Sequence, residues 1–275
     1  MKTVNMPDIP LPSPEDWDYY KNYNCREYIE EILESLQRDN RFLVDFRFQK
    51  LLMWFSKEGN EYGATQKILN KGTVLYRARI YDKRADSNEK AESRFNGYGK
   101  IESFVLPESV YIKEGRANPG NVRYLYTSSS CCTAIAEVNP PLKSDVSVAE
   151  IVTNENLYIL SFDSFSSSST GPDDDEKRWK RNFIIEITRL FNTPSEKQGY
   201  ILCQYISEFA KNLGYDGISF RSSKVKTDPD KNTDVNYVIF NFDKCEAVSS
   251  ELYYISDRKI EVKVRTTSGY VKNAD

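Results

Sequence analysis

The sequence predicts an α+β fold in which a mixed β core is flanked by helices. Two observations favour this class. Short apolar runs with the alternation of strands and longer runs with apolar residues at helical spacing both occur along the chain. The two kinds of run are mixed without the regular β–α–β alternation of a doubly wound sheet.

The length of 275 residues favours one main domain with a small appendage. We expect an N-terminal helical extension over residues 1–69, a central domain over 70–250 and a hairpin or tail over 251–275. The first boundary is placed where long helical runs give way to short strands and loops.

The N-terminal extension is predicted to contain two helices. Residues 1–20 are polar and rich in proline, which favours an extended lead-in. Asn24 followed by Glu27 has the pattern of a helix N-terminus, and apolar residues recur at helical spacing over 28–36. A second such run covers 42–59, and we interpret its aromatic side chains as core packing rather than as a partner-binding face.

The central segment is predicted as short strands joined by loops. Strands are expected at 74–80, 123–127, 146–152, 157–162, 216–222 and 237–242. The polar stretch 82–119 is rich in Gly, Asn and Pro and is predicted to be a long loop. Loops of this length inside a compact domain often contact ligands, and disorder is the alternative. Ser128–Ser130 can cap a short helix through Ala136, which Pro140 then ends.

Two longer helices and a hairpin complete the expected elements. Apolar residues recur at helical spacing over 179–191. The range 193–213 begins with a capping box and has Pro194 at its first helical position, and Gly214 supplies a left-handed stop. Alternating apolar residues predict a terminal hairpin over 252–264.

Composition excludes several classes of function. The net charge of −3 argues against a broad basic surface for nucleic acid. The chain contains no histidine, which excludes Ser-His-Asp and Cys-His catalysis and most catalytic zinc sites. General acid–base chemistry therefore falls to Glu, Asp, Tyr or Lys. The five cysteines lack a disulfide or metal spacing, so we expect reduced thiols and no metal site.

The distribution of apolar residues along the chain bears on localisation. Residues 1–5 lack the apolar segment of a signal peptide, and no run reaches the apolar length of about 18 residues that a membrane helix needs. We therefore expect a cytoplasmic protein with no membrane partner.

Charged residues in separate segments suggest the chemistry. The planar guanidiniums of Arg77 and Arg116 can bind phosphate oxygens with charge-assisted hydrogen bonds. A carboxylate such as that of Glu137 can stabilise positive charge on a sugar while its glycosidic bond breaks. Such a set suits a ligand with phosphates at one end and a glycosidic bond at the other. The candidate residues also have structural explanations. Arg77 could form an ion pair, and Arg116 could cap a carbonyl. Two further candidates, Tyr126 and Ser222, could be a core residue and a turn cap.

Six motifs in chain order resemble the RES family, which is named for its Arg, Glu and Ser. They are LYRAR at 75–79, GRANPG at 115–120, YLYTS at 124–128, TAIAEV at 133–138, YDGISFRSS at 215–223 and NYVIF at 236–240. The resemblance covers about 70–245 and implies an NAD-consuming protein with an ADP-ribosyltransferase-like fold. Many members are bacterial toxins, so it also implies an antitoxin as partner. NAD is then the substrate, with phosphate as a co-substrate and no permanently bound cofactor.

The resemblance also implies which residues form the site. We expect catalytic roles for Arg77, Arg116, Tyr126 and Glu137. Contacts to NAD are expected from Arg77, Arg116, Asn118, Tyr126 and Ser222. One position departs from the pattern of some members, because Ala78 stands where they have an aromatic residue directly after the first arginine. A stacking side chain would then have to come from Tyr76 or Tyr81.

Three hypotheses for function follow. The first is cleavage of the nicotinamide–ribose bond of NAD, by phosphorolysis or hydrolysis. The second is transfer of ADP-ribose to a protein. The third is an inactive module that binds a nucleotide or a partner, although a carboxylate beside an anionic ligand argues against it.

Overall fold

The computed structural model describes residues 8–40, 44–62, 65–83, 94–104, 111–163, 174–192, 200–225, 234–257, 263–265 and 271–273. These ranges contain helices, an eight-stranded mixed sheet and a two-stranded sheet. This confirms the predicted α+β class. None of the described helices is both long enough and apolar enough to cross a membrane.

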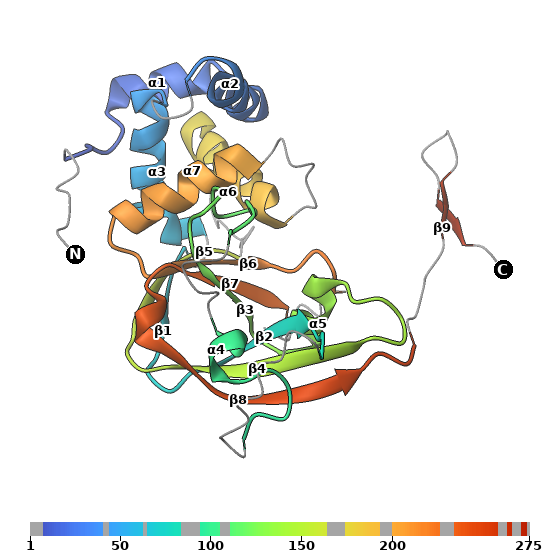
Figure 1. Ribbon diagram of the computed structural model, residues 1–275. Coiled ribbons are helices and arrows are strands. Elements are labelled where there is room, and N and C mark those ends of the chain that lie inside the picture. The colour runs from blue at the N-terminus through green and yellow to red at the C-terminus, as the bar shows by residue number, and fades with distance from the viewer. Residues whose placement is uncertain are drawn as a thin grey trace.

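A group of longer helices lies over one side of the sheet (Figure 1). These helices are α1 (Pro14–Lys21), α2 (Cys25–Arg38), α3 (Phe46–Glu58), α6 (Asp175–Asn192) and α7 (Tyr200–Asn212). The shorter helical segments are η1 (Gly59–Tyr62), α4 (Lys100–Ser103), α5 (Cys131–Val138) and η3 (Phe242–Lys244).

The main sheet has the strand order β1-β5-β6-β7-β3-β2-β4-β8. Its strands are β1 (Gln66–Leu69), β2 (Val74–Ile80), β3 (Leu125–Ser128), β4 (Asp145–Thr153), β5 (Leu157–Phe162), β6 (Gly217–Arg221), β7 (Val235–Ile239) and β8 (Cys245–Tyr254). Only β5 and β6 pair in parallel among these neighbours. Parallel neighbours need a crossover connection, and this one contains α6 and α7.

One pair of neighbouring strands is barely joined. β2 pairs with β4 along its whole length, from Val74 to Ile80. With β3 it shares a single residue pair, Tyr76 with Ser128. The sheet therefore parts between β2 and β3 beyond this pair, while β3 remains fully paired with β7 on its other side.

Stacked rings connect the N-terminal helices to the sheet. Phe55 of α3 stacks on Phe162 of β5, with ring centroids 5.2 Å apart and an interplanar angle of 8°. Phe162 in turn stacks on Phe191 of α6 at 4.3 Å. All three rings are almost fully buried and belong to the same hydrophobic cluster. Phe48, Trp54 and Phe55 of α3 are therefore core residues, as the sequence predicts, whereas Phe46 is 51% exposed.

The N-terminal lead-in is not extended throughout, which corrects the expectation for residues 1–20. Helix α1 begins at Pro14, and Ser13 caps it. The Ser13 side chain accepts a hydrogen bond from the backbone N–H of Asp16, and the Asp16 carboxylate accepts one from the backbone N–H of Ser13. This capping box is a local signal that outweighs the proline-rich composition.

Other elements differ from prediction mainly at their ends. Asn24 caps α2 as expected. Within the described residues the last long helix begins at Tyr200, and 193–199, with Pro194 and the proposed capping box, lie outside them. Gly214 has a φ of 92°, the left-handed stop that was predicted.

The predicted C-terminal hairpin over 252–264 is wrong. Leu252–Tyr254 are the end of β8, which pairs with β4. The hairpin lies further along the chain, between β9 (Lys263–Arg265) and β10 (Val271–Asn273). Strand β1, which was not predicted, begins at Gln66 and pairs with β5, so the sheet starts before residue 70.

A buried carboxylate joins the first residues of the two parallel strands, β5 and β6. Asp216 is 2% exposed and directly precedes β6. It accepts hydrogen bonds from the Tyr158 N–H at 2.9 Å, from Asn241 Nδ2 at 2.7 Å and from Lys244 Nζ at 2.9 Å. Burial alone would raise the pKa of Asp216, but these bonds together hold it below its ordinary value.

We therefore predict that Asp216→Asn lowers the free energy of unfolding by about 1–3 kcal/mol at pH 7. A carboxylate with a lowered pKa in the fold stabilises it above its unfolded pKa of about 3.9, and this stabilisation is lost as the pH falls through the lowered value. The difference from wild type should accordingly narrow below about pH 4. Urea unfolding as a function of pH measures it.

Asp243→Asn is the matched control, because Asp243 is a neighbouring exposed aspartate. Its substitution should change the unfolding free energy by less than about 0.5 kcal/mol at either pH. An equal loss for Asp216→Asn at pH 7 and pH 3 would show that the ionised carboxylate is not responsible.

Candidate functional site

A cavity of about 430 Å³ lies where β2 and β3 part. Arg77, Arg116, Tyr126 and Glu137, the four residues predicted to be catalytic, all line it. They come from β2, from the loop before β3, from β3 and from α5. The other lining residues are Tyr76, Ala78, Thr127, Ser128, Ala134, Val138, Tyr200, Phe220 and Asn236.

Arg77 lies in the middle of β2, at the gap between the strands. One terminal nitrogen, Nη1, donates a hydrogen bond to the carbonyl oxygen of Tyr126 at 3.1 Å. The Arg77 Nε is buried and has no hydrogen-bond partner in the described residues. No described carboxylate forms an ion pair with Arg77, so the ion-pair alternative finds no support there.

Burial lowers the pKa of Arg77 to about 10, and the positive charge of Arg79 contributes in the same direction. The side chain nevertheless remains protonated at neutral pH. Arg77 is half-buried and its Nε is fully shielded from water, so a cation there without an acidic partner in the described residues is costly, and a bound anion would offset that cost. Arg79 itself points elsewhere, because it donates to the Glu102 carbonyl and lies over the ring of Tyr98.

Arg116 reaches the cavity from the helical side. It donates a hydrogen bond through Nη1 to the carbonyl oxygen of Phe191, near the C-terminus of α6. Its guanidinium carbon is 5.4 Å from the ring centroid of Phe220 and 6.0 Å from that of Tyr200. The carbonyl-capping alternative is therefore correct for one nitrogen. No described carboxylate pairs with Arg116, and its other nitrogens donate no hydrogen bond there.

Tyr126 is held by the loop that carries Arg116. Its hydroxyl donates to Asn118 Oδ1 at 2.7 Å and accepts from the Ala117 N–H at 3.1 Å. Burial raises the pKa of Tyr126 well above its ordinary value, so the hydroxyl stays neutral. Its role as a donor within the protein is thereby fixed.

Asn118 does not line the 430 Å³ cavity. It is 2% exposed, and its amide nitrogen donates to backbone carbonyls of its own loop, those of Lys113, Pro119 and Val122. Its contact to NAD stays a prediction, whereas its position shows that it holds Tyr126 and shapes the loop.

Glu137 lies in the last turn of α5, which Ser130 caps as predicted. Its Oε1 accepts hydrogen bonds from Ser222 Oγ at 2.5 Å and from Asn236 Nδ2 at 2.7 Å. A carboxylate at a helix C-terminus is disfavoured by the helix dipole, and these two donors compensate for that position. Glu137 Oε2 accepts no hydrogen bond from the described residues.

Ser222 contacts the site through its hydrogen bond to Glu137. It is 4% exposed and does not itself line the cavity. Its Oγ accepts from the Lys224 N–H at 3.1 Å while it donates to Glu137. Its contact to NAD stays a prediction, whereas its position shows that it holds the Glu137 carboxylate.

Sequence reasoning missed three residues of this site. Asn236 donates to Glu137, Ser128 donates to Asn236 Oδ1 at 2.7 Å, and Tyr200 lies beside Arg116. The first two lie within the quoted motifs NYVIF and YLYTS, but a buried strand explains those motifs equally well. Of the two aromatic candidates, Tyr76 lines the cavity, whereas Tyr81 packs against Tyr98.

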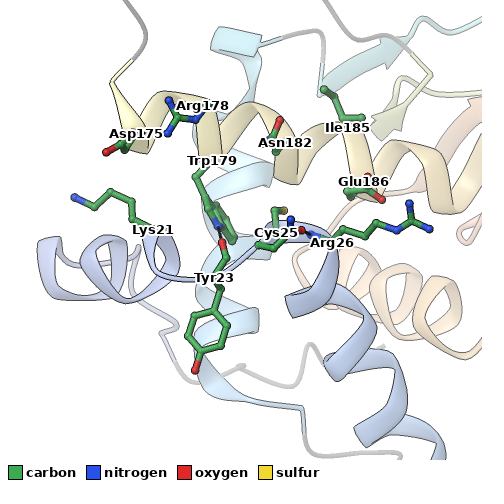
Figure 2. Close-up of a pocket in the computed structure, with 11 residues that line it drawn as sticks. Lys21, Tyr23, Cys25, Arg26, Asp175, Arg178, Trp179, Asn182, Ile185 and Glu186 are labelled. Carbon is green, nitrogen blue, oxygen red and sulfur yellow. Dashed lines mark hydrogen bonds and ion pairs between the residues drawn. The ribbon is translucent and has the colours of Figure 1, made fainter.

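A second cavity, of about 410 Å³, lies between the α1–α2 connection and α6 (Figure 2). Its cations are already paired with acids of their own helices, in Lys21–Asp18, Arg26–Glu30 and Arg178–Asp175. The cavity with Arg77 and Arg116 differs, because neither cation pairs with an acid in the part of the chain that the structure describes. We therefore assign the functional site to it.

Other reactive groups do not compete with this site. Burial raises the pKa of the Cys131 thiol at the start of α5, which favours packing over nucleophilic chemistry. In the described part of the chain, no three Cys, Asp or Glu side chains are placed to hold a metal ion.

Gly115 leaves no room for a larger side chain in the loop. A Cβ there would lie 2.6 Å from Asn118 Oδ1 and 2.7 Å from the Tyr126 hydroxyl. Gly115→Ala should therefore break the Tyr126–Asn118 hydrogen bond and lower the free energy of unfolding by about 1–3 kcal/mol. Gly120→Ala is the matched control in the same loop, because its Cβ would meet nothing closer than 3.6 Å. Equal urea midpoints for the two variants would contradict the prediction.

Comparison with known proteins places the chain in a family. The RES domain model matches residues 74–262, and no curated protein matches the sequence. Among solved structures, the chain is similar to the crystal structure of the M. tuberculosis MbcT–MbcA toxin–antitoxin complex, with a TM-score of 0.40 and 12% identity. That match covers 75% of this chain and 93% of the other. The family match spans well over half of the sequence, and the chain therefore belongs to the RES domain family.

Proposed function

We propose that this chain is an NAD-consuming enzyme that cleaves the bond between nicotinamide and ribose, with phosphate or water as the acceptor. RES domain toxins act on NAD, and membership in the family supports the substrate class. The observation that carries the proposal is the shared cavity, in which two cations that have no acidic partner among the described residues face the same space as an anchored carboxylate.

The two arginines would bind the diphosphate of NAD. Each has already used one Nη1 on a backbone carbonyl, of Tyr126 for Arg77 and of Phe191 for Arg116. These bonds orient the guanidinium planes before a ligand arrives and leave further N–H groups for phosphate oxygens. The anionic ligand would supply the negative charge that the described residues do not.

Glu137 would act at the sugar. As the C1″–N bond of the nicotinamide ribose breaks, its electron pair leaves with nicotinamide, and positive charge develops on the ribose. A carboxylate in the same cavity stabilises that charge. An oxygen of phosphate or water then forms the new bond to C1″ and loses a proton to solvent. Nicotinamide leaves as a neutral base and needs no strong acid, which suits a chain without histidine.

Tyr126 would shape the nicotinamide–ribose end of the cavity. Its hydroxyl is engaged by Asn118 and Ala117, so the ring is fixed in place. The face of a fixed aromatic ring is a suitable surface for the flat nicotinamide group.

Glu137→Gln tests the proposed chemistry. Glutamine retains the oxygen that accepts from Ser222 and Asn236 but removes the negative charge. We expect the rate of nicotinamide release to fall by about 10²–10³-fold, while the dissociation constant for NAD changes by less than about 3-fold. Chromatography of NAD incubations and calorimetry measure these quantities.

Glu114→Gln is the matched control, because Glu114 is an exposed glutamate near the site that does not line the cavity. It should turn over NAD at the wild-type rate. Mass spectrometry with and without phosphate identifies the acceptor, as ADP-ribose 1″-phosphate, ADP-ribose or a mass increase on protein. Wild-type protein that releases no nicotinamide under any of these conditions would refute the proposal.

We further propose that the chain is a toxin and that its antitoxin is a protein that covers the cavity. Support comes from the family alone, whose toxins act on NAD. A covering partner would block substrate entry without any change in the site.

Expression of the wild-type chain in bacteria is therefore predicted to arrest growth and to deplete cellular NAD by at least about tenfold, as expected for an enzyme with an ordinary turnover of about 10 s⁻¹. Glu137→Gln should permit growth at equal protein levels. Growth arrest with an unchanged NAD pool would exclude NAD loss as its cause.

A further inference from the structure

We propose that Asn236 is a positioning residue that fixes which oxygen of Glu137 faces the substrate. The inference rests on the proposed function and extends it by a residue of β7 and by Ser128 of β3. It is carried by two hydrogen bonds that end on one carboxylate oxygen and by two more that orient the donors of the first two.

Two donors act on the same oxygen. Asn236 Nδ2 lies 2.7 Å from Glu137 Oε1, and Ser222 Oγ lies 2.5 Å from it. No described group donates to Oε2. The carboxylate is thereby held by one oxygen, and the other is left for a ligand in the cavity that Glu137 lines.

The orientation of the Asn236 amide is fixed from behind. Ser128 Oγ lies 2.7 Å from Asn236 Oδ1 and donates to it. A carboxylate only accepts hydrogen bonds, so the amide nitrogen must face Glu137 and the amide oxygen must face Ser128. Reversing the amide would break the bond to Glu137 and would turn Ser128 from a donor into an acceptor. Asn236 and Ser128 are 6% and 3% exposed, so water cannot readily replace either partner.

Ser222 is fixed in the same sense. The Lys224 N–H donates to its Oγ at 3.1 Å, which leaves the hydroxyl hydrogen for Glu137. The two branches thus run from Lys224 through Ser222 and from Ser128 through Asn236 to Oε1. Both branches present hydrogens to that oxygen and hold it in one position.

Loss of this anchoring would affect the reaction more than binding. A reacting group displaced by about 1 Å can cost about 10²-fold in rate. The diphosphate contacts proposed for Arg77 and Arg116 would remain. We therefore expect a selective fall in kcat.

Asn236→Leu tests the proposal, because leucine has a similar shape and cannot donate. It should lower kcat by about 10–100-fold and change KM for NAD by less than about 3-fold. In the Glu137→Ala background the same substitution should cause no further loss, because a residue that acts through the carboxylate has nothing left to position. Additive losses in the double variant would overturn the proposal.

Ser128→Ala provides a second variant, which removes only the group that orients the amide. It should lower kcat by about 3–10-fold, less than Asn236→Leu, because the amide can still donate part of the time. Ser249→Ala is the matched control, since Ser249 Oγ donates to Glu150 at 2.8 Å in a similar serine–glutamate bond outside the cavity. It should leave kcat and KM unchanged.

Urea unfolding of the same variants separates this inference from the proposed function. The midpoint shift caused by Asn236→Leu should be larger in wild type than in the Glu137→Ala background, whether or not NAD is consumed. Equal shifts would overturn the Asn236–Glu137 contact. Unequal shifts in a protein that never consumes NAD would instead leave the contact standing and refute the proposed function.

Discussion

The site depends on one interruption of the sheet. β2 and β3 are neighbours, yet they share a single residue pair. Strand backbone groups without a ladder partner need another one, and the guanidinium of Arg77 provides it for the carbonyl of Tyr126. The same interruption leaves room for the cavity. One arginine therefore helps to maintain the opening in the sheet and directs positive charge into it.

Around this opening, the charges of the cations are not matched by acids in the way that they are in the second cavity. The cations of the second cavity are matched by acids three or four residues away. Arg77 and Arg116 bond to backbone carbonyls, which orient a guanidinium without neutralising it. Glu137 is anchored by neutral donors, which leave its charge intact. The cavity thus keeps separate charges of both signs available to a ligand.

Local patterns in the sequence predicted the elements that carry the site. β2 has its predicted bounds, and Ser130 caps α5, because both signals lie within a few adjacent residues. Four of the side chains that the motifs indicated line the cavity, whereas those of Asn118 and Ser222 lie behind it. Asn236 could not be predicted in this way, because its partners Glu137 and Ser128 lie 99 and 108 positions away. A strand pattern fixes which side chains are buried but not which distant group each one meets.

The stacked rings of Phe55, Phe162 and Phe191 bear on how small a working fragment can be. Phe191 also supplies the carbonyl that orients Arg116. The family match begins at residue 74, beyond α3, and so leaves out Phe55. A protein that begins at residue 74 would lose the ring that stacks on Phe162. Phe162 in turn stacks on Phe191, so the position of the carbonyl that orients Arg116 would be less well fixed. The smallest autonomous form of this protein is therefore longer than its family signature.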